Sequence, residues 1–200
     1  MDTARRAMTV AMWCAVAALM LGATAAVAQR AERAEAKVGD RWRFEQRDRR
    51  TGLKEYETVR VVTAVGASRI TTTEGDGSGS FTADWNALDT PRGSNSESVK
   101  FLDFPLEVGK KWAFKTQWTN KINQSRGRHQ FDVAVVAHER VKVPAGEFDA
   151  FKIEAKGFWN NDTSGRSGRT VRTYWFAPAA RQVVKTENDD GHNLWVNELM

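Results

Sequence analysis

Apolar and polar residues alternate with a period of two through most of the chain, and this alternation constrains the fold more than any other feature. In WAFKTQW, Trp112, Phe114 and Trp118 fall on one face. In FKIEAK, Phe151 and Ile153 alternate with lysine and glutamate. A strand with one buried face needs this spacing, because successive side chains point to opposite sides of a sheet. The chain is therefore predicted to be rich in β-strands.

Turn residues separate the alternating runs, and they favour antiparallel connections. Gly75-Asp76-Gly77 and Pro144-Ala145-Gly146 are two such separators, and glycine supplies the positive φ that tight turns require. No helical stretch is long enough to act as the crossover that parallel strands need. We predict an all-β fold, an antiparallel meander of about nine to eleven strands forming a curved sandwich or open barrel.

The first 28 residues have the organisation of a secretory signal peptide. Arg5 and Arg6 precede an apolar stretch that ends in Ala26-Val27-Ala28, and these small residues suit a signal peptidase. We therefore expect a cleaved signal over 1–28, a periplasmic or secreted bacterial protein, and no transmembrane segment after signal removal. The only cysteine is Cys14, so the exported chain must be stabilised by its core and not by disulfides.

The rest of the chain is predicted to contain a short linker and one domain. Residues 29–37 form the linker, in which Ala31–Ala36 (AERAEA) is the one short helical-looking piece, a connector or a single turn. Residues 38–200 form a single β-rich domain, long enough to bury a core of its own. The polar run Pro91–Ser98 is expected to separate two halves of one sheet system.

Charge and motif content exclude several classes of function. The net charge of +5 comes from 30 basic and 25 acidic residues that are interspersed, which is typical of a solvated surface, and we expect no nucleic-acid partner. The three histidines, His129, His138 and His192, lack metal-ligand spacing. The Gly75–Gly79 segment is followed by a strand pattern and not by the helix that a phosphate loop needs. No catalytic residue, metal or cofactor is assigned.

Three segments resemble a known group of proteins. These are FPLEVGKKW (104–112), VPAGEFDAFKIE (143–154) and YWFAPAARQVVKTEN (174–188). In this order and spacing they are similar to a group of bacterial exported domains of unknown function that includes the TapB-like proteins. The resemblance covers roughly residues 38–199, implies a periplasmic β-rich fold and carries over no catalytic residues. Relatives often have glycine where this chain has Ala179-Ala180.

Tryptophan content suggests a site. The chain has eight tryptophans, of which only Trp13 lies in the first 28 residues. Most are expected in the core. Trp112, Phe114 and Trp118 are the candidate ligand-binding residues, because on the concave side of a curved sheet they would line a groove for a lipid tail, an apolar peptide or a sugar face. The competing expectation is that a second sheet covers them.

Two functions from different classes remain. The first is a non-enzymatic periplasmic binding or envelope-associated module, whose partner would be a lipid, an apolar peptide or an envelope protein. The alternative is a periplasmic hydrolase with dispersed catalytic residues such as His138 and Glu147. Glu147 and Asp149 are more simply explained as the solvated face of a strand that follows the Pro144 turn.

Overall fold

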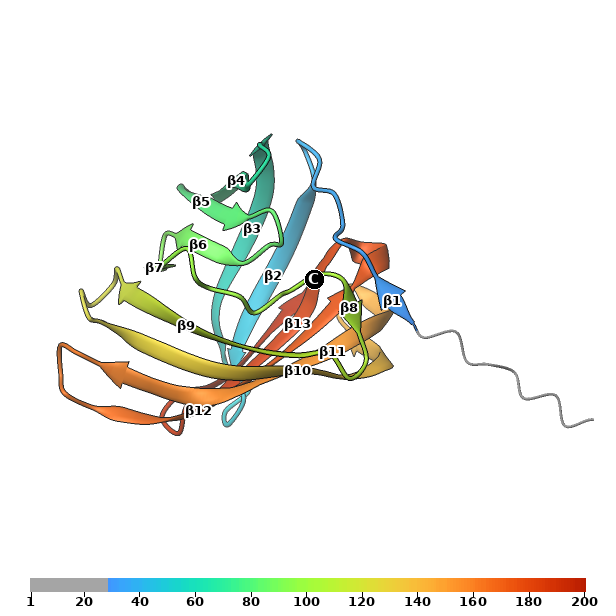
Figure 1. Cartoon of the computed structure of the whole chain (residues 1–200). Coiled ribbons are helices and arrows are strands. Elements are labelled where there is room, and N and C mark those ends of the chain that lie inside the picture. Colours follow the sequence, from blue (N-terminus) through green and yellow to red (C-terminus); the bar gives the residue numbers. More distant parts are fainter. Residues whose placement is uncertain (1–28) are drawn as a thin grey trace, which may run out of the picture.

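The fold is a closed antiparallel β-barrel. The computed structural model describes residues 29–200, so the predicted signal peptide over 1–28 lies outside the described residues. Twelve strands pair around the barrel (Figure 1), and this confirms the all-β antiparallel meander, with slightly more strands than expected and with the sheet closed on itself. Closure removes the unpaired edges that would expose backbone hydrogen-bonding groups.

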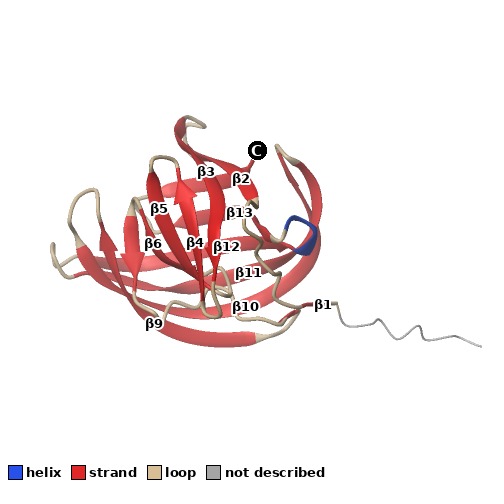
Figure 2. Ribbon diagram, turned by 90° about the horizontal axis from the view of Figure 1, so that it is seen from above, coloured by secondary structure: helices blue, strands red, loops and turns tan. Residues whose placement is uncertain are grey.

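The order of strands around the barrel follows the order in the chain. The barrel strands are β2 (Arg41–Asp48), β3 (Lys54–Val65), β4 (Arg69–Glu74), β5 (Gly77–Thr82), β6 (Ala87–Thr90), β7 (Gly93–Asn95), β9 (Lys111–Asn120), β10 (Arg126–Val143), β11 (Gly146–Asn161), β12 (Ser167–Ala177), β13 (Gln182–Asp189) and β14 (Leu194–Leu199). Two non-sequential pairings complete the ring: β7 pairs with β9, and β14 pairs with β2. Figure 2 shows the strands surrounding the interior.

Three short elements lie outside this ring. Strands β1 (Arg30–Ala31) and β8 (Leu106–Glu107) pair with each other, and a 3-10 helix, η1 (Pro178–Ala180), connects β12 to β13. Within residues 29–200, no helix is long and apolar enough to cross a bilayer.

The N-terminal segment differs from the expectation of a helical turn. Ala31 belongs to β1, and no regular structure follows over residues 32–37. Ala31 is buried and pairs with the fully buried Leu106 of β8. The gain from burying this alanine in an extended conformation outweighs the weak helical preference of so short a segment. The helical turn is therefore wrong for Ala31–Ala36.

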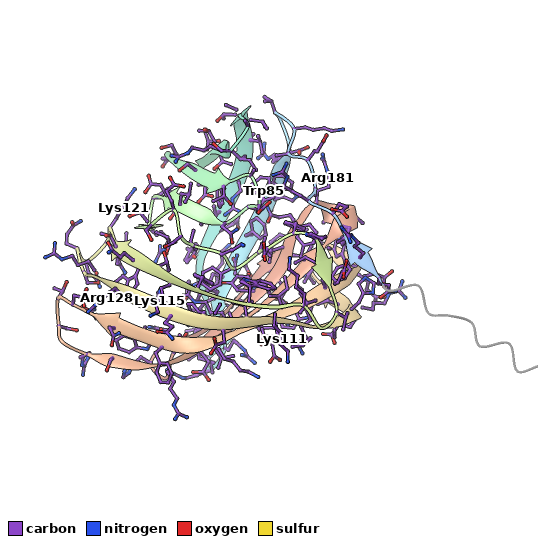
Figure 3. The ribbon with its side chains drawn as sticks, in the orientation of Figure 1. Trp85, Lys111, Lys115, Lys121, Arg128 and Arg181 are labelled. Atoms are coloured by element: carbon purple, nitrogen blue, oxygen red, sulfur yellow. The ribbon has the colours of Figure 1, made fainter. Side chains whose placement is uncertain are left out.

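In the alternating segments of β9 and β11, the alternating apolar side chains face the interior of the barrel and the charged side chains point outward, as predicted. On β9, Phe114 is buried and faces the interior, whereas Lys111 and Lys115 are exposed on the outer surface (Figure 3). On β11, Phe151 and Ile153 are buried. The turn predicted at Pro144 is also present, since β10 ends at Val143, and β11 begins at Gly146, where φ is 139°.

The chain between β7 and β9 fills one part of the barrel, and we call residues 96–105 the plug segment. Its residue Phe101 packs against Phe114, Phe131 and Tyr174, with ring centroids 4.9, 5.0 and 5.1 Å away. Asn86 fixes the segment by donating to the Leu102 carbonyl at 2.9 Å and accepting from the Leu102 N–H at 2.8 Å. The expected second sheet is therefore wrong, because this segment covers the aromatic face instead.

Candidate functional site

The interior of the barrel has an apolar end and a polar end. The apolar end holds the plug segment and fully buried side chains such as Phe131, Phe151 and Phe176. The polar end contains a cavity of about 870 Å³, the main cavity, whose lining includes Tyr56 and Trp118. A second cavity of about 300 Å³, the end cavity, lies beside it. The two cavities share several lining residues, among them Trp118, Asn120, His129, Arg172 and Asn193.

The end cavity is built where every second turn of the meander, β9–β10, β11–β12 and β13–β14, lies at the same end of the barrel. The β9–β10 turn contributes Asn123 and Ser125, the end of β11 contributes Trp159 and Asn161, and the β13–β14 turn contributes Asp190, His192 and Asn193. Side chains that are distant in the sequence meet here because an antiparallel meander places alternate turns side by side at one end. The result is a wall of tryptophan rings and short polar side chains.

Glycines opposite two tryptophans make room for the rings in this wall. Gly127 of β10 pairs with Trp118 of β9, and Gly168 of β12 pairs with Trp159 of β11. A Cβ atom at Gly127 would lie 2.6 Å from Cζ2 of Trp118, and one at Gly168 would lie 2.9 Å from Nε1 of Trp159. A side chain at Gly168 would therefore press on the Trp159 ring, whereas one at Gly127 would clash first with the Asn160 carbonyl of β11, 1.9 Å away.

Within residues 29–200, Arg172 is the one charged residue that lines three cavities of the barrel in common. It lies on β12 and is partly buried, and it lines the main cavity, the end cavity and a third cavity of about 200 Å³. Its Nε donates to Oδ1 of Asn188 at 3.1 Å. The guanidinium carbon lies 5.2 Å from the Phe101 ring centroid and 5.6 Å from that of Phe131, so Arg172 stands at the boundary between the two ends.

His129 is neutral in this environment. Burial, together with the positive charge of Arg172, lowers the pKa of His129 to about 3, although the charge of Asp190 acts in the opposite direction. Its ring stacks on that of Trp118, with centroids 5.7 Å apart and an interplanar angle of 30°. A neutral imidazole offers one donor and one acceptor and adds no charge to the cavity at neutral pH.

Asp190 is the acidic residue of the end cavity, and hydrogen bonds of its own turn hold it. Its Oδ1 accepts from the backbone N–H groups of His192 and Asn193 at 2.9 and 2.7 Å, and Oδ2 accepts from the Asn193 amide at 3.0 Å. Burial alone would raise the pKa of Asp190, but bonds from Asn193 and His192 outweigh it and hold the pKa below its usual value. The carboxylate therefore stays ionised and structures the turn.

The arginines of the main cavity are placed differently from Arg172. Arg60 of β3 forms an ion pair with Glu74 at 2.7 Å, and its guanidinium lies 4.4 Å from the Phe81 ring centroid. Arg92 is exposed and lies over Tyr56, 4.2 Å from the ring centroid. Burial raises the pKa of Tyr56, which keeps its hydroxyl protonated. Arg60 is therefore neutralised by a carboxylate, whereas Arg92 stacks on an aromatic ring.

Several buried polar atoms of the cavity walls have no protein partner. They are Nε1 of Trp118, Nδ1 of His129, Oγ1 of Thr170 and Oδ1 of Asn197. The first three belong to residues that line the end cavity, and Asn197 lines the main cavity. Buried polar groups are nearly always hydrogen-bonded, and clustered exceptions mark a place where water or a ligand completes the bonding.

The three candidate ligand-binding residues face the interior, but they lie in different surroundings. Trp112 donates from Nε1 to the Lys100 carbonyl at 2.6 Å. Phe114 is 8% exposed and packs against Phe101. Trp118 lines both the main and the end cavity. The plug segment thus occupies the space beside Trp112 and Phe114, and Trp118 alone of the three borders a cavity.

The residues considered for a hydrolase are not brought together. His138 packs against Phe151, with ring centroids 4.6 Å apart. Glu147 is exposed near Arg140 at 3.7 Å and pairs in the sheet with Lys142. Lys142 is four positions along β10 from His138, a separation of roughly 13 Å along the strand. Among residues 29–200, no group of three or more His, Cys, Asp or Glu side chains is placed to hold a metal.

Sequence reasoning missed the principal residues of this site. It considered His129 only as a metal ligand and did not single out Arg172 or Trp159. One signal was available in the segment RTVRTYWF, where Thr170, Arg172 and Tyr174 alternate on the strand face that points inward. The single arginine therefore lies at a position that is usually apolar in the core of a barrel. The glycines opposite Trp118 and Trp159 become informative only when the strand register is known.

Comparison with known proteins identifies the fold. No protein-family model matches the sequence, and no curated protein matches it. The structure is similar to a Bacteroides fragilis protein classed as exported and having a YmcC-like fold, with a TM-score of 0.59 and 15% identity over 84% of this chain and 97% of that one. It is also similar to a Parabacteroides distasonis protein classed as a lipoprotein, with a TM-score of 0.56 and 13% identity over 84% and 97% of the two chains. The chain therefore shares the fold of these two proteins.

Proposed function

We propose that this chain is a non-enzymatic binding module of the bacterial envelope that holds a polar ligand inside its barrel. The observation that carries the proposal is the main cavity, which together with the end cavity opens the polar end of the interior. Its volume of about 870 Å³ falls within the usual range of small-molecule sites. The unpartnered polar atoms in its wall supply the specific contacts that such a site needs.

The lining favours a polar ligand over the acyl chain or apolar peptide suggested by the sequence. Asn120, Asn193 and Asn197 line the main cavity beside Trp118 and Trp195. Burying amides against a hydrocarbon chain would cost their hydrogen bonds to water without replacing them. Of the three candidate ligand-binding residues, the proposal retains Trp118 as a direct contact and assigns Trp112 and Phe114 to the wall that holds the plug segment.

Binding is favoured over catalysis by the contacts of the ionisable side chains. Arg60 is paired with Glu74, and Asp190 is engaged by its own turn. Burial keeps His129 neutral with a pKa of about 3, which makes it a poor general base at neutral pH. A site of this kind can recognise a ligand through donors, acceptors and ring faces without changing it.

Location in the envelope is supported by two observations. The predicted signal peptide over 1–28 would export the chain to the periplasm or beyond. The structural neighbours are classed as an exported protein and a lipoprotein. Membership of the group that includes the TapB-like proteins belongs to the same proposal.

Native mass spectrometry of protein purified gently from the periplasm tests this function. We expect a bound small molecule that is lost in Trp118→Ala, whose ring lines the cavities. The matched control is Phe158→Ala, because Phe158 of β11 is an aromatic residue with a side chain that is 55% exposed. Equal retention in both variants, or a protein that carries no ligand and takes up none from a periplasmic extract, would contradict the proposal.

A further inference from the structure

Arg172 carries a positive charge into the polar end of the barrel without a carboxylate partner. None of the ion pairs among residues 29–200 includes it, although Arg60, which shares the main and third cavities with it, is paired with Glu74. Its side-chain hydrogen-bond partners are neutral groups, the Asn188 amide and the Tyr174 hydroxyl. Keeping a cation partly buried without a counter-charge is costly, so an anion that enters the cavity would recover part of this cost.

The guanidinium also restricts the kind of anion. Its N–H donors form a planar fork that matches the two oxygens of a carboxylate or two oxygens of a phosphate. Nε donates to Asn188 and the guanidinium also bonds to the Tyr174 hydroxyl, so the remaining N–H groups are left for a ligand. The aromatic rings of Phe101 and Phe131 lie beside the guanidinium and help to hold it in place.

The remainder of the end cavity offers ring faces and amides. Trp118 and Trp159 supply the aromatic surfaces, and four asparagines with one serine supply the polar groups: Asn120, Asn123, Asn161, Asn193 and Ser125. The Oδ1 atoms of Asn120, Asn123 and Asn161 already accept hydrogen bonds within their own turns. These amides therefore offer their N–H groups, which can donate to the hydroxyl oxygens of a sugar. An aromatic face packs against the C–H face of a flat, saturated ring. A bare phosphate would use Arg172 but neither the rings nor most of the amides.

Asp190 and His129 do not cancel the preference of the end cavity for an anion. Asp190 is the carboxylate that lines the end cavity, and its oxygens are occupied by the N–H groups of His192 and Asn193. His129 remains neutral and can therefore accept or donate a hydrogen bond without repelling a cationic neighbour. The positive charge that is open to a ligand in this cavity is that of Arg172.

We infer that the end cavity is a subsite for an acidic sugar, whose carboxylate is bound by Arg172 and whose ring lies between the tryptophan and asparagine side chains. The inference rests on the proposed function, since it names the ligand class of the same interior site. The main cavity, which shares Trp118 and Asn193 with the end cavity, would hold further sugar units of an oligosaccharide. Arg172 is then the residue that distinguishes acidic from neutral saccharides.

The test uses trigalacturonate, its fully methyl-esterified form and inorganic phosphate, each titrated into the protein by calorimetry. The ester keeps the sugar rings and removes the charge. We expect the acid to bind about tenfold or more tightly than the ester. Arg172→Gln should abolish this difference. Arg169→Gln is the matched control, because Arg169 lies on the same strand and is exposed, and it should leave both affinities within about twofold.

Two binding results would overturn the inference of an acidic-sugar subsite. Equal binding of acid and ester would remove the role of the charge, and phosphate that binds as tightly as the trisaccharide would indicate a bare anion site. If Arg172→Gln does not fold, Arg172→Lys replaces it, and loss of the two-oxygen contact should still weaken the acid relative to the ester. If no saccharide binds while native mass spectrometry shows another ligand lost in Trp118→Ala, the acidic sugar is refuted and the binding function stands. If neither probe detects a ligand, both fail.

Discussion

The two ends of the barrel interior are made by the same strands and serve different purposes. Strands β9 and β10 place Phe114 and Phe131 in the apolar end. Four residues along β9 and two residues along β10, they place Trp118 and His129 in the polar end. The plug segment fills the first end and leaves the second open. The comparison shows that the side chains of the strands alone do not fill a closed barrel of this size, and that a segment such as the plug segment is needed to fill the rest. The part of the interior that the plug segment leaves open is the space we propose for a ligand.

Removing a large side chain from the apolar end should have the largest effect on stability. Phe131 is fully buried and contacts Phe101 and Phe114. We expect Phe131→Ala to lower the free energy of unfolding by about 3–5 kcal/mol, through lost burial and the cavity left behind. Urea unfolding followed by tryptophan fluorescence measures the change. A loss below about 1 kcal/mol would show that this end is not the structural core.

Releasing the plug segment should have the next largest effect. Asn86→Ala removes the amide that bonds to both backbone groups of Leu102 and leaves those buried groups unsatisfied. We expect a loss of about 2–3 kcal/mol in the free energy of unfolding. Asn160→Ala is the control, since Asn160 is exposed on β11, and it should change stability by less than about 0.5 kcal/mol. Similar values for the two variants would mean that the plug segment is not held by Asn86.

The polar end should make stability dependent on pH through His129. Its folded-state pKa of about 3 lies below the ordinary value of 6.5, so the unfolded chain takes up a proton first as the pH falls. This contribution is fully present above pH 6.5 and is lost progressively toward pH 3. Between pH 7 and pH 5 we expect a loss of about 2 kcal/mol. His129→Gln should remove that part of the pH dependence; an unchanged slope would show that His129 is not buried as described.

Loss of Arg172 should have the smallest effect on stability. Arg172→Gln removes a cation that has no carboxylate partner, so we expect the free energy of unfolding of the ligand-free protein to change by less than about 1 kcal/mol. Arg60→Gln leaves Glu74 buried without its partner and should cost more. Parallel denaturation of the two variants provides the comparison. A large loss from Arg172→Gln would assign this residue to the core and not to the binding cavity.

The local parts of this fold could be predicted from the sequence, and the long-range parts could not. Alternation in 112–118 and 151–156 identified the strands and their buried faces, and Pro144 with Gly146 identified the turn between two of them. Closure depends on the pairing of β14 with β2 and of β7 with β9. No local pattern encodes these pairings, because they depend on the curvature accumulated over the whole sheet.

The candidate site was predictable only in part, for a related reason. Alternation correctly placed Trp118 on the inner face, together with Trp112 and Phe114. It could not show that the plug segment occupies the space beside two of these residues, since Phe101 and Leu102 lie in a region without alternation. The meeting of Trp118, Trp159 and Arg172 follows from the register of four strands. Their roles as ligand contacts stay proposals.

The most direct test is a crystal structure of the protein purified gently from the periplasm and then crystallised with trigalacturonate. We expect electron density for a ligand in the end and main cavities, with a carboxylate against the guanidinium of Arg172 and a sugar ring beside Trp118. The plug segment should remain packed on Phe114 and Phe131. Side chains that fill the polar end, or a ligand bound only to the outer face of the barrel, would contradict the assignment of the interior as the binding site.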